Sequence, residues 1–298
     1  MELADESACL ILGASGTVGR FLTARLRGST SKLLALSRRE VATGNDHIRW
    51  IRGDLYGDVP DLHETPVQLI YSVGPLDGLA QWLRAARLPS LRRVVALSSM
   101  SLEVKAQSRD PAERDLAARL ASAEREVIDF CSGRDIACVV LRPTLIYGGG
   151  SDRSLSLLAK VGRRWRVFPS IPGATGLRQP IHADDLAAAC VAAMAIAGPL
   201  PKILRVGGAE QLTFGAMLSR TRGSLSLWTI PVWIPMRSAR ALLRLLRLLP
   251  RWRHLDQGLV ERLQQDQIVD NEPAMRELNW QPGNFDPGRP GTFLNNQS

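Results

Sequence analysis

The chain has 298 residues, which is enough for one large domain or two smaller ones. Hydrophobic residues make up 45% of it and charged residues 22%, a balance that excludes a disordered chain, a fibrous protein and a disulfide-stapled mini-protein. No stretch approaches the roughly 18 uncharged apolar residues of a membrane span, and the four cysteines have neither metal-ligand nor disulfide spacing. Residues 1–7 carry three acidic side chains where a signal peptide would be basic, so we expect a cytoplasmic protein without a metal site.

The apolar pattern predicts alternating strands and helices. Short apolar runs that suit strands buried on both faces lie at residues 8–12, 32–36, 47–51, 67–71, 93–97 and 137–141. Stretches with helical periodicity lie between several of them, at residues 20–26, 79–86 and 111–131. Strands separated by helices indicate an α/β fold with a doubly wound parallel sheet of the Rossmann type.

A glycine-rich turn joins the first strand to the first helix with the spacing Gly13-x-x-Gly16-x-x-Gly19. In a dinucleotide-binding unit the first glycine permits the tight turn, the second lets a pyrophosphate approach the backbone, and the third lets the helix pack on the sheet. The helix N-terminus then offers N–H groups to the phosphates. We therefore predict dinucleotide binding by this turn, including Ser15, Thr17 and Val18, over the alternative of a purely structural glycine turn.

The end of the second strand bears on the choice of cofactor. NAD-binding proteins usually hold a carboxylate there for the ribose 2′-hydroxyl, whereas this chain has Ser37, Arg38 and Arg39. Guanidinium groups suit a 2′-phosphate, so the sequence favours NADP(H), with NAD(H) as second choice; two solvated arginines are the alternative. Asp54, before Leu55 at the end of the third strand, is a candidate partner for the adenine amino group or a simple turn residue.

Six motifs in order resemble the extended or atypical short-chain dehydrogenase/reductases, the NAD(P)-dependent nucleotide-sugar epimerase/dehydratase family. They are the glycine turn, Gly53-Asp54-Leu55, Ser98-Ser99, Leu141-Arg142-Pro143-Thr144 with Ile146-Tyr147-Gly148, Gln179 to Ala187, and Val206-Gly207-Gly208. A tail from Asp270 to Pro282 is similar to the family's closing segment. The resemblance implies redox or epimerase-type chemistry on a nucleotide-sugar or a similar hydroxyl or carbonyl substrate.

The resemblance also implies a split architecture. Residues 1–147 would bind the cofactor and residues 148–298 would form a substrate-binding lobe, with a strand near residues 203–206 returning to the sheet. Val73, Gly74, Pro143 and Ile146 join the expected cofactor contacts. A homodimer is expected by analogy with the family.

The catalytic positions depart from the family's pattern. The resemblance implies a Ser, a Tyr and a Lys, the last two spaced Tyr-x-x-x-Lys; a nearby Lys and the cofactor lower the pKa of the Tyr so that it can transfer a proton. Ser99 matches the Ser, but Leu116 and Leu120 occupy the Tyr and Lys positions. Lys105 is the sole Lys, and no Tyr occurs, between residues 72 and 146.

Four interpretations of this departure stay open. The chain is an enzyme with another acid or base, an enzyme whose cofactor and a different base suffice, a non-catalytic NAD(P)H-binding accessory or scaffold protein, or a partner protein with a vestigial site. Charged residues near the missing Tyr, which are more often solvated helix residues, are Asp110, Arg114, Asp115 and Arg119.

Further residues of the second half have two interpretations each. Tyr147 is a wall of the substrate cleft or a core aromatic, and His182 lines the cleft, where we favour a structural histidine over a base. Asp184 and Asp185 precede an apolar helix and are expected to cap it.

Basic residues are concentrated late in the chain. Net charge is +9, 34 of the 38 basic residues are Arg, and residues 237–253 hold six Arg and no acid. Within residues 231–253 the arginines recur at three- and four-residue steps between leucines, which predicts an amphipathic helix. Packing in the lobe is the favoured interpretation, ahead of peripheral membrane or anionic-partner docking and of direct phosphate contact. No nucleic-acid-binding motif accompanies the charge, so we expect no nucleic-acid partner.

Overall fold

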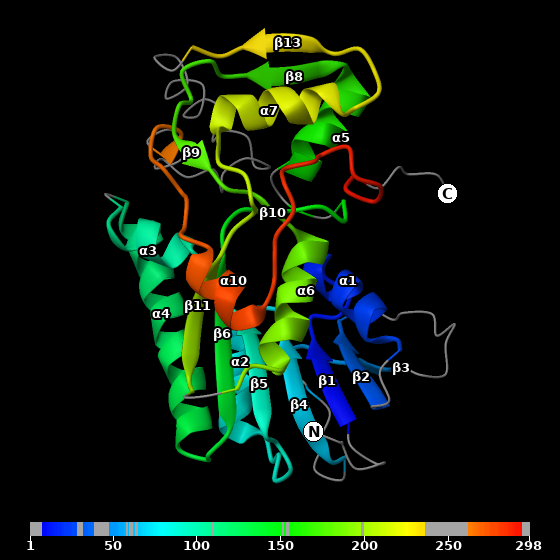
Figure 1. Cartoon of the computed structure of the whole chain (residues 1–298), viewed down its shortest axis with the longest axis vertical. Coiled ribbons are helices and arrows are strands. Elements are labelled where there is room, and N and C mark those ends of the chain that lie inside the picture. The colour runs from blue at the N-terminus through cyan, green and yellow to red at the C-terminus, as the bar shows by residue number, and fades with distance from the viewer. Residues whose placement is uncertain are drawn as a thin grey trace.

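The molecule is built on a seven-stranded parallel sheet (Figure 1). The computed structural model describes residues 8–28, 32–38, 48–57, 59, 62, 65–108, 110–150, 152, 155–197, 200–235 and 262–293. The strand order is β11-β6-β5-β4-β1-β2-β3, so the chain runs outward from β1 in one direction and then, from β4 onward, in the other. The strands are β1 (Ala8–Leu12), β2 (Lys32–Ser37), β3 (Ile48–Arg52), β4 (Val67–Ser72), β5 (Arg93–Leu97), β6 (Ala137–Pro143) and β11 (Lys202–Val206).

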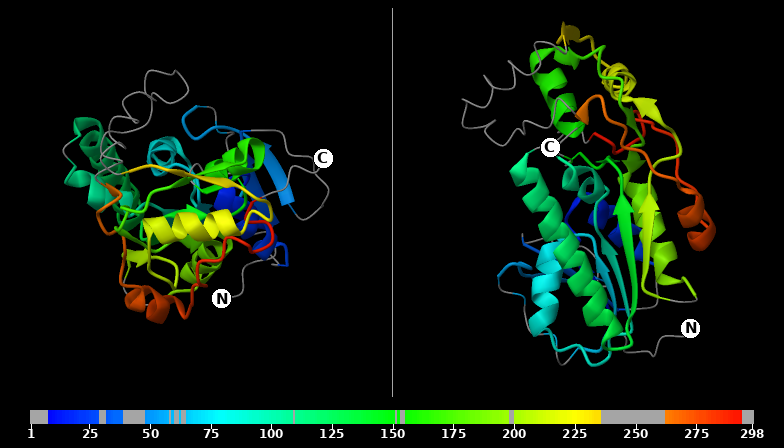
Figure 2. Two further views of the ribbon diagram at one scale, coloured as in Figure 1. Left: turned by 90° about the horizontal axis from the view of Figure 1, so that it is seen from above. Right: turned by 90° about the vertical axis from the view of Figure 1, so that its left-hand side faces the viewer.

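Helices cover both faces of this sheet, as the right-hand view of Figure 2 shows. On one face α1 (Thr17–Leu26) and α6 (Ala183–Met194) close a core around Ile11 and Leu141. On the other face α2 (Leu76–Ala85) and α4 (Pro111–Ser132) close a second core around Leu10 and Val140. Alternate residues of each strand therefore serve opposite cores, which is why the central strands are apolar at successive positions. The predicted doubly wound α/β fold is confirmed.

The two halves of the sequence interleave in space. β11 pairs in parallel with β6, from Lys202 opposite Val139 to Val206 opposite Pro143. The helix α10 (Glu272–Leu278) contributes Ala274 and Leu278 to the first core. The sheet-containing part is thus completed by α6, β11 and α10, all of which follow residue 147 in sequence.

The remaining elements form a smaller lobe beyond the carboxyl ends of the strands (Figure 1). Its core includes Tyr147, Phe168, Met217 and Phe285, all at most 4% exposed. Its sheets have two strands each: β10 with β7, β12 with β9, and β13 with β8. The lobe elements are β7 (Ile146–Tyr147), α5 (Leu155–Trp165), β8 (Val167–Ser170), β9 (Leu177–Arg178), β10 (Ile181–His182), β12 (Leu212–Thr213), α7 (Phe214–Gly223) and β13 (Ile230–Trp233).

Candidate functional site

The turn between β1 and α1 has the geometry that its glycines predict. Gly13 has φ +81°, and a Cβ atom there would lie 2.7 Å from the backbone nitrogen of Gly74. A Cβ atom at Gly19 would lie 2.2 Å from the carbonyl oxygen of Gly13. Gly16 is exposed, and α1 begins directly after it without a side-chain cap. Packing therefore requires Gly13 and Gly19, whereas Gly16 leaves the backbone open to a ligand.

Gly74 brings a second turn against the first one, at the point where the sheet order reverses. The backbone nitrogen of Val73 donates to the carbonyl oxygen of Leu12 at 2.9 Å, which extends the β1–β4 pairing to the turn. Among the described residues, the buried hydroxyls of Ser72 and Ser98 have no hydrogen-bond partner. Ser72 ends β4 and Ser98 follows β5, so both belong to the carboxyl edge where ligands bind in open α/β sheets.

The residues predicted to determine which cofactor binds lie at the ends of neighbouring strands. Ser37 is 4% exposed and donates from its hydroxyl to Ser15 Oγ at 2.9 Å. Arg38 is exposed beside it, while Arg39 lies outside the described residues. An Asp54 carboxylate oxygen accepts from the backbone nitrogen of Tyr56 at 3.1 Å, which is the turn contact that the alternative interpretation expects. Leu55, close behind, is buried against the turn of Gly74.

A cavity of about 960 Å³ opens beyond β5 and β6. It is lined by three of the predicted site residues, Ser99, Pro143 and Ile146. The hydroxyls of Ser99 and Ser101 lie 2.8 Å apart, and Ser99 Oγ also accepts from the backbone nitrogen of Ser101 at 3.1 Å. Other polar side chains of the lining come from α3 (Ser101–Ala106), from the turn after it, from the start of α4 and from residues 262–268: Glu103, Gln107, Ser108, Glu113, Arg262, Gln264, Gln265, Asp266 and Gln267.

Glu113 is the most deeply buried charge of this cavity, at 4% exposure. It lies in the first turn of α4, where the helix dipole favours a carboxylate. Ser108 donates to it at 2.5 Å, Arg262 pairs with it, and Lys105 Nζ lies 3.9 Å away. Burial lowers the pKa of Arg262, against the opposing field of Asp110. Lys105, the lysine nearest to the expected Tyr-x-x-x-Lys segment, therefore belongs to an ion cluster at the cavity wall.

A second ion cluster holds α4 against β6. Arg142 pairs with Glu124, which is 3% exposed, and donates to Glu103 at 2.7 Å. Arg205 of β11 donates to the same Glu103 at 2.9 Å. The hydrogen bonds to Glu124 raise the pKa of Arg142. Arg142 is thus held by ion pairs behind the cavity. Its neighbour Pro143 lines the cavity, whereas Arg142 does not.

Comparison with known proteins gives structural matches only. No protein-family model and no curated protein matches the sequence. MoeE5 in complex with UDP-glucose and NAD is 19% identical, with a TM-score of 0.71 over 96% of this chain and 97% of that one. UDP-glucuronic acid 4-epimerase from Bacillus cereus, solved with UDP-glucuronic acid and NAD, is 15% identical, with a TM-score of 0.70 over 96% and 98%. The epimerase Mth375 from Methanothermobacter thermautotrophicus is 14% identical, with a TM-score of 0.72 over 97% and 91%.

The chain has the fold of the nucleotide-sugar epimerases and dehydratases. This confirms the predicted resemblance to the extended short-chain dehydrogenase/reductases at the level of fold. Against that fold, α4 carries Leu116 and Leu120, both half-buried, at the positions that the resemblance assigns to Tyr and Lys. No Tyr is among the residues that line the cavity within the described ranges. The nearby Asp110 caps α4 by accepting from Ala112 N at 2.9 Å, and Arg114, Asp115 and Arg119 are exposed.

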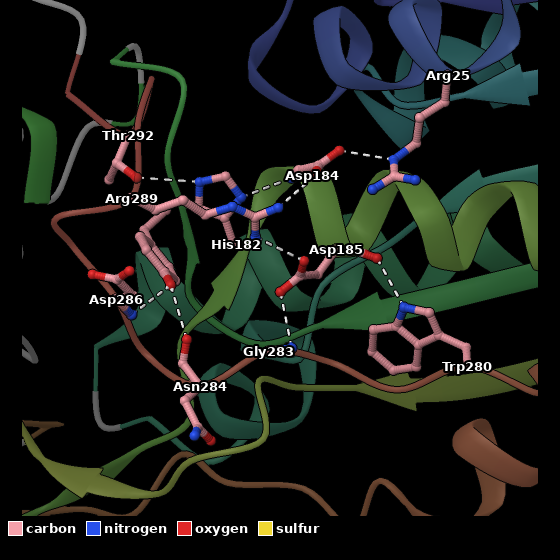
Figure 3. Close-up of polar contacts among 11 residues, drawn as sticks. Arg25, His182, Asp184, Asp185, Trp280, Gly283, Asn284, Asp286, Arg289 and Thr292 are labelled. Atoms are coloured by element: carbon pink, nitrogen blue, oxygen red, sulfur yellow. Dashed lines mark hydrogen bonds and ion pairs between the residues drawn. The ribbon is translucent and has the colours of Figure 1, made fainter.

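His182 lies between β10 and α6, where the sheet-containing part meets the lobe (Figure 3). It is not among the residues that line the cavity. It is 2% exposed, and its Nδ1 accepts from the backbone nitrogen of Asp184 at 3.1 Å, so it caps α6. Its Nε2 faces Thr292 Oγ1 at 3.3 Å. Burial, followed by the charge of Arg289, lowers the pKa of His182. These contacts agree with the structural interpretation of this histidine.

The junction of sheet and lobe also contains Tyr147 and the two aspartates that were predicted to cap α6. The Tyr147 hydroxyl accepts from the backbone nitrogen of Asp286 at 3.1 Å, and burial raises its pKa to about 12. Asp184 pairs with Arg25 and Arg289, and Asp185 pairs with Arg289 at 2.9 Å (Figure 3). The expectation that the aspartates cap α6 is wrong, because a histidine nitrogen takes that role and the carboxylates form ion pairs.

Sequence reasoning missed much of the cavity lining. Glu113, Arg262 and residues 264–268 belong to no motif, and the signal available was limited to the position of Glu113 in the first turn of a predicted helix. The amphipathic helix predicted within residues 231–253 is wrong at its start, because Ile230–Trp233 form the strand β13, which pairs with β8. The arginine-rich part, residues 237–253, lies outside the described residues. Within the described ranges, no helix is long and apolar enough to cross a bilayer, and no cluster of His, Cys, Asp and Glu could hold a metal ion.

Proposed function

We propose that this protein binds a nicotinamide dinucleotide at the carboxyl edge of the sheet and performs redox or epimerase-type chemistry on a nucleotide-sugar, or a similar hydroxyl or carbonyl compound. The observation that carries this proposal is that the glycine turn and the Ser99 cavity share one edge of one sheet. A parallel sheet binds its ligands at that edge, across the point where strand order reverses. Structural neighbours solved with UDP-sugars and NAD support the same assignment.

The residues present fit a dinucleotide. Gly16 and Ser15 are exposed at the N-terminus of α1, where a pyrophosphate would meet backbone N–H groups. Gly74 packs against Gly13 at the same edge, so Val73 and Gly74 would flank a bound dinucleotide. Pro143 and Ile146 line the cavity, where the nicotinamide would lie. When bound, the cofactor supplies a hydride acceptor or donor. Ser99 then orients the reacting hydroxyl of the substrate through its own hydroxyl.

The cofactor that we propose is NADP(H). Arg38 is exposed at the end of β2, where its guanidinium can pair with a 2′-phosphate. NAD(H) is the second candidate, which the NAD-bound neighbours favour.

Calorimetric titration with NADPH, NADP⁺, NADH and NAD⁺ tests the cofactor. Arg38→Ala should weaken NADPH binding about tenfold or more, the worth of a charge-assisted hydrogen bond, and leave NADH binding unchanged. Arg49→Ala is the matched control, because Arg49 is exposed on β3 away from its carboxyl end. An equal loss of affinity for NADPH and NADH would contradict the assignment of Arg38 to the 2′-phosphate. If no dinucleotide binds, the proposed function is wrong.

A second candidate function is favoured by Leu116 and Leu120. Without a Tyr in the cavity lining within the described ranges, the same site suits a non-catalytic NAD(P)H-binding accessory or scaffold protein. Incubating the protein with NAD(P)⁺ and UDP-sugars, and following the absorbance of reduced nicotinamide together with the sugar products, separates the two. Turnover that is lost in Ser99→Ala supports the enzyme, whereas tight cofactor binding without turnover supports the accessory protein.

A further inference from the structure

The outer end of the lobe exposes large aromatic side chains. We call the elements α5, β8, α7 and β13 with their connecting turns, residues 155–170 and 211–235, the lobe tip. Figure 1 shows β13 and β8 at one end of the longest dimension of the molecule, farthest from the sheet. Trp165, Trp228 and Trp233 are 66%, 75% and 71% exposed there. Ile230 and Val232, at 48% and 44%, extend the apolar surface between them.

The pairing of β13 with β8 brings these residues to one end of the lobe. Ile230 lies opposite Val167, and Trp233 lies opposite Ser170. Trp165, the last residue of α5, and Trp228 each stand two residues before this first pair, and the backbone nitrogen of Ile230 donates to the carbonyl oxygen of Arg166 at 2.7 Å between them. Along the chain the exposed Trp228, Ile230 and Val232 alternate with Thr229, which is 5% exposed, and Pro231, which is half-buried. Alternate residues of a strand face opposite sides, so Trp228, Ile230 and Val232 share one face, while Trp233 is exposed at the end of β13.

The lobe tip is also entirely without acidic residues. Residues 155–170 and 211–235 contain no Asp or Glu. They contain six basic residues, and the guanidinium of Arg164 lies 5.0 Å from the ring centroid of Trp165. The basic residues of the lobe tip are Lys160, Arg163, Arg164, Arg166, Arg220 and Arg222, of which Arg220 pairs with Glu210 just outside the tip.

We propose that the lobe tip is a docking surface for an anionic lipid bilayer. Tryptophan places its ring at the boundary between acyl chains and head groups, and arginine and lysine pair with lipid phosphates. A group of large exposed apolar side chains of this kind marks an interaction site. The inference is independent of the cofactor site, which lies at the sheet edge.

Charge argues against a second copy of the chain as the occupant. In a symmetric dimer the same surface meets itself, so two lobe tips would bring basic side chains such as Arg164 of both copies together without any acidic residue from either tip. Like charges in such a contact repel, whereas a bilayer with anionic head groups supplies the opposite charge. We therefore assign an anionic lipid bilayer, and not a second copy of the chain, as the partner of the lobe tip.

Flotation of the full-length protein with lipid vesicles tests this proposal. We expect the protein to float with vesicles of phosphatidylglycerol and phosphatidylcholine, and to float at least about tenfold less with phosphatidylcholine alone or at high salt. Brominated acyl chains should quench part of the tryptophan fluorescence, because the lobe-tip rings enter the interface.

Two pairs of substitutions in the lobe tip should each reduce flotation about tenfold or more. Trp228→Ala with Trp233→Ala removes two of the three exposed indole rings, and Lys160→Glu with Arg164→Glu reverses two exposed charges of α5. Arg87→Glu with Arg92→Glu is the matched control, with the same change in net charge on exposed residues between α2 and β5. The control should float like the unaltered protein, and dinucleotide titrations should be unchanged in all variants.

Three outcomes would overturn the proposal. One is no flotation of the unaltered protein with anionic vesicles. Another is undiminished flotation of both lobe-tip variants while Arg244→Glu with Arg247→Glu abolishes it, which would place the contact in residues 237–253. The third is a dimer in sedimentation equilibrium that the tryptophan variant alone dissociates, because the patch would then serve a protein contact.

Discussion

The glycine turn after β1 and the cavity beyond β5 lie on the same edge of the sheet, yet they are built in different ways. The turn consists of seven consecutive residues, 13–19, and its geometry follows from backbone conformation and the absence of Cβ atoms. The cavity takes its lining from residues 99–108, Glu113, residues 143–146 and residues 262–268, which only the fold brings together. A local site tolerates changes elsewhere in the chain, whereas a site of this second kind depends on the ion pairs that hold its segments.

The largest effect is expected at the turn, from Gly19→Ala. Its Cβ atom would lie 2.2 Å from the carbonyl oxygen of Gly13, and neither backbone can move without opening the β1–α1 unit. We expect the free energy of unfolding to fall by about 4 kcal/mol, at the upper end for overpacking. Urea denaturation measures it.

Gly16→Ala is the matched control for the turn. Its Cβ atom would lie 3.1 Å from the same oxygen, at an exposed position. We expect a change in unfolding free energy below about 1 kcal/mol, together with weaker dinucleotide binding. Equal destabilisation by both substitutions would contradict the division of labour between these glycines.

Behind the cavity, Arg142→Met should have the next largest effect. It leaves Glu124 buried without its guanidinium partner, which costs about 3 kcal/mol of unfolding free energy. Arg205→Met, which removes the exposed partner of Glu103, is the comparison and should cost less than about 1 kcal/mol. If the two variants were equally stable, the frame of the cavity would not depend on the buried pair.

His182 gives the junction a dependence on pH. Its pKa in the folded protein is below the ordinary value of about 6.5, so the unfolded chain binds more protons as pH falls through that value. Stability is therefore full above the unfolded pKa and declines on acidification, by at most about 1.4 kcal/mol per pH unit, until the folded pKa is reached. His182→Asn, which keeps a capping oxygen, should remove this slope in urea titrations at a series of pH values. An unchanged slope would assign the effect to other groups.

The smallest effect on stability is expected within the cavity itself. Ser99→Ala removes a half-buried hydroxyl that contacts Ser101, and should change the unfolding free energy by less than about 1 kcal/mol. Turnover with a UDP-sugar, if the protein is an enzyme, should fall far more than stability does. A parallel loss of folding and turnover would mean that Ser99 acts only through packing.

The same contrast explains which parts of the molecule the sequence predicts. β1, β4 and β5 begin within one residue of the predicted positions, because buried parallel strands are short apolar runs between helical segments. The glycine turn could also be predicted, because its geometry depends on residues that are close in sequence. By contrast, Arg262 lies 149 residues from its partner Glu113, and no spacing rule connects them.

The cap of α6 was mispredicted for a related reason. Helix-start rules favour Asp over His, and two aspartates stand at residues 184 and 185. In the structure these carboxylates are drawn to Arg25 and Arg289, which come from the two ends of the chain. The capping role then falls to His182 Nδ1. Competition between a local and a distant partner decides the outcome, and only the local partner is visible in the sequence.

Residues 280–293 have a consequence for the order of events during synthesis. The Trp280 indole donates to the carbonyl oxygen of Asp185, Phe285 enters the lobe core, and the backbone nitrogen of Gly149 donates to the carbonyl oxygen of Gly291. This segment leaves the ribosome after the strands β1 to β6 and most of the lobe have emerged, and domains begin to fold while the chain is still growing. The contacts between residues 280–293 and the junction of sheet and lobe therefore form late, and ribosome-bound intermediates should expose that junction to chaperones until this segment has emerged.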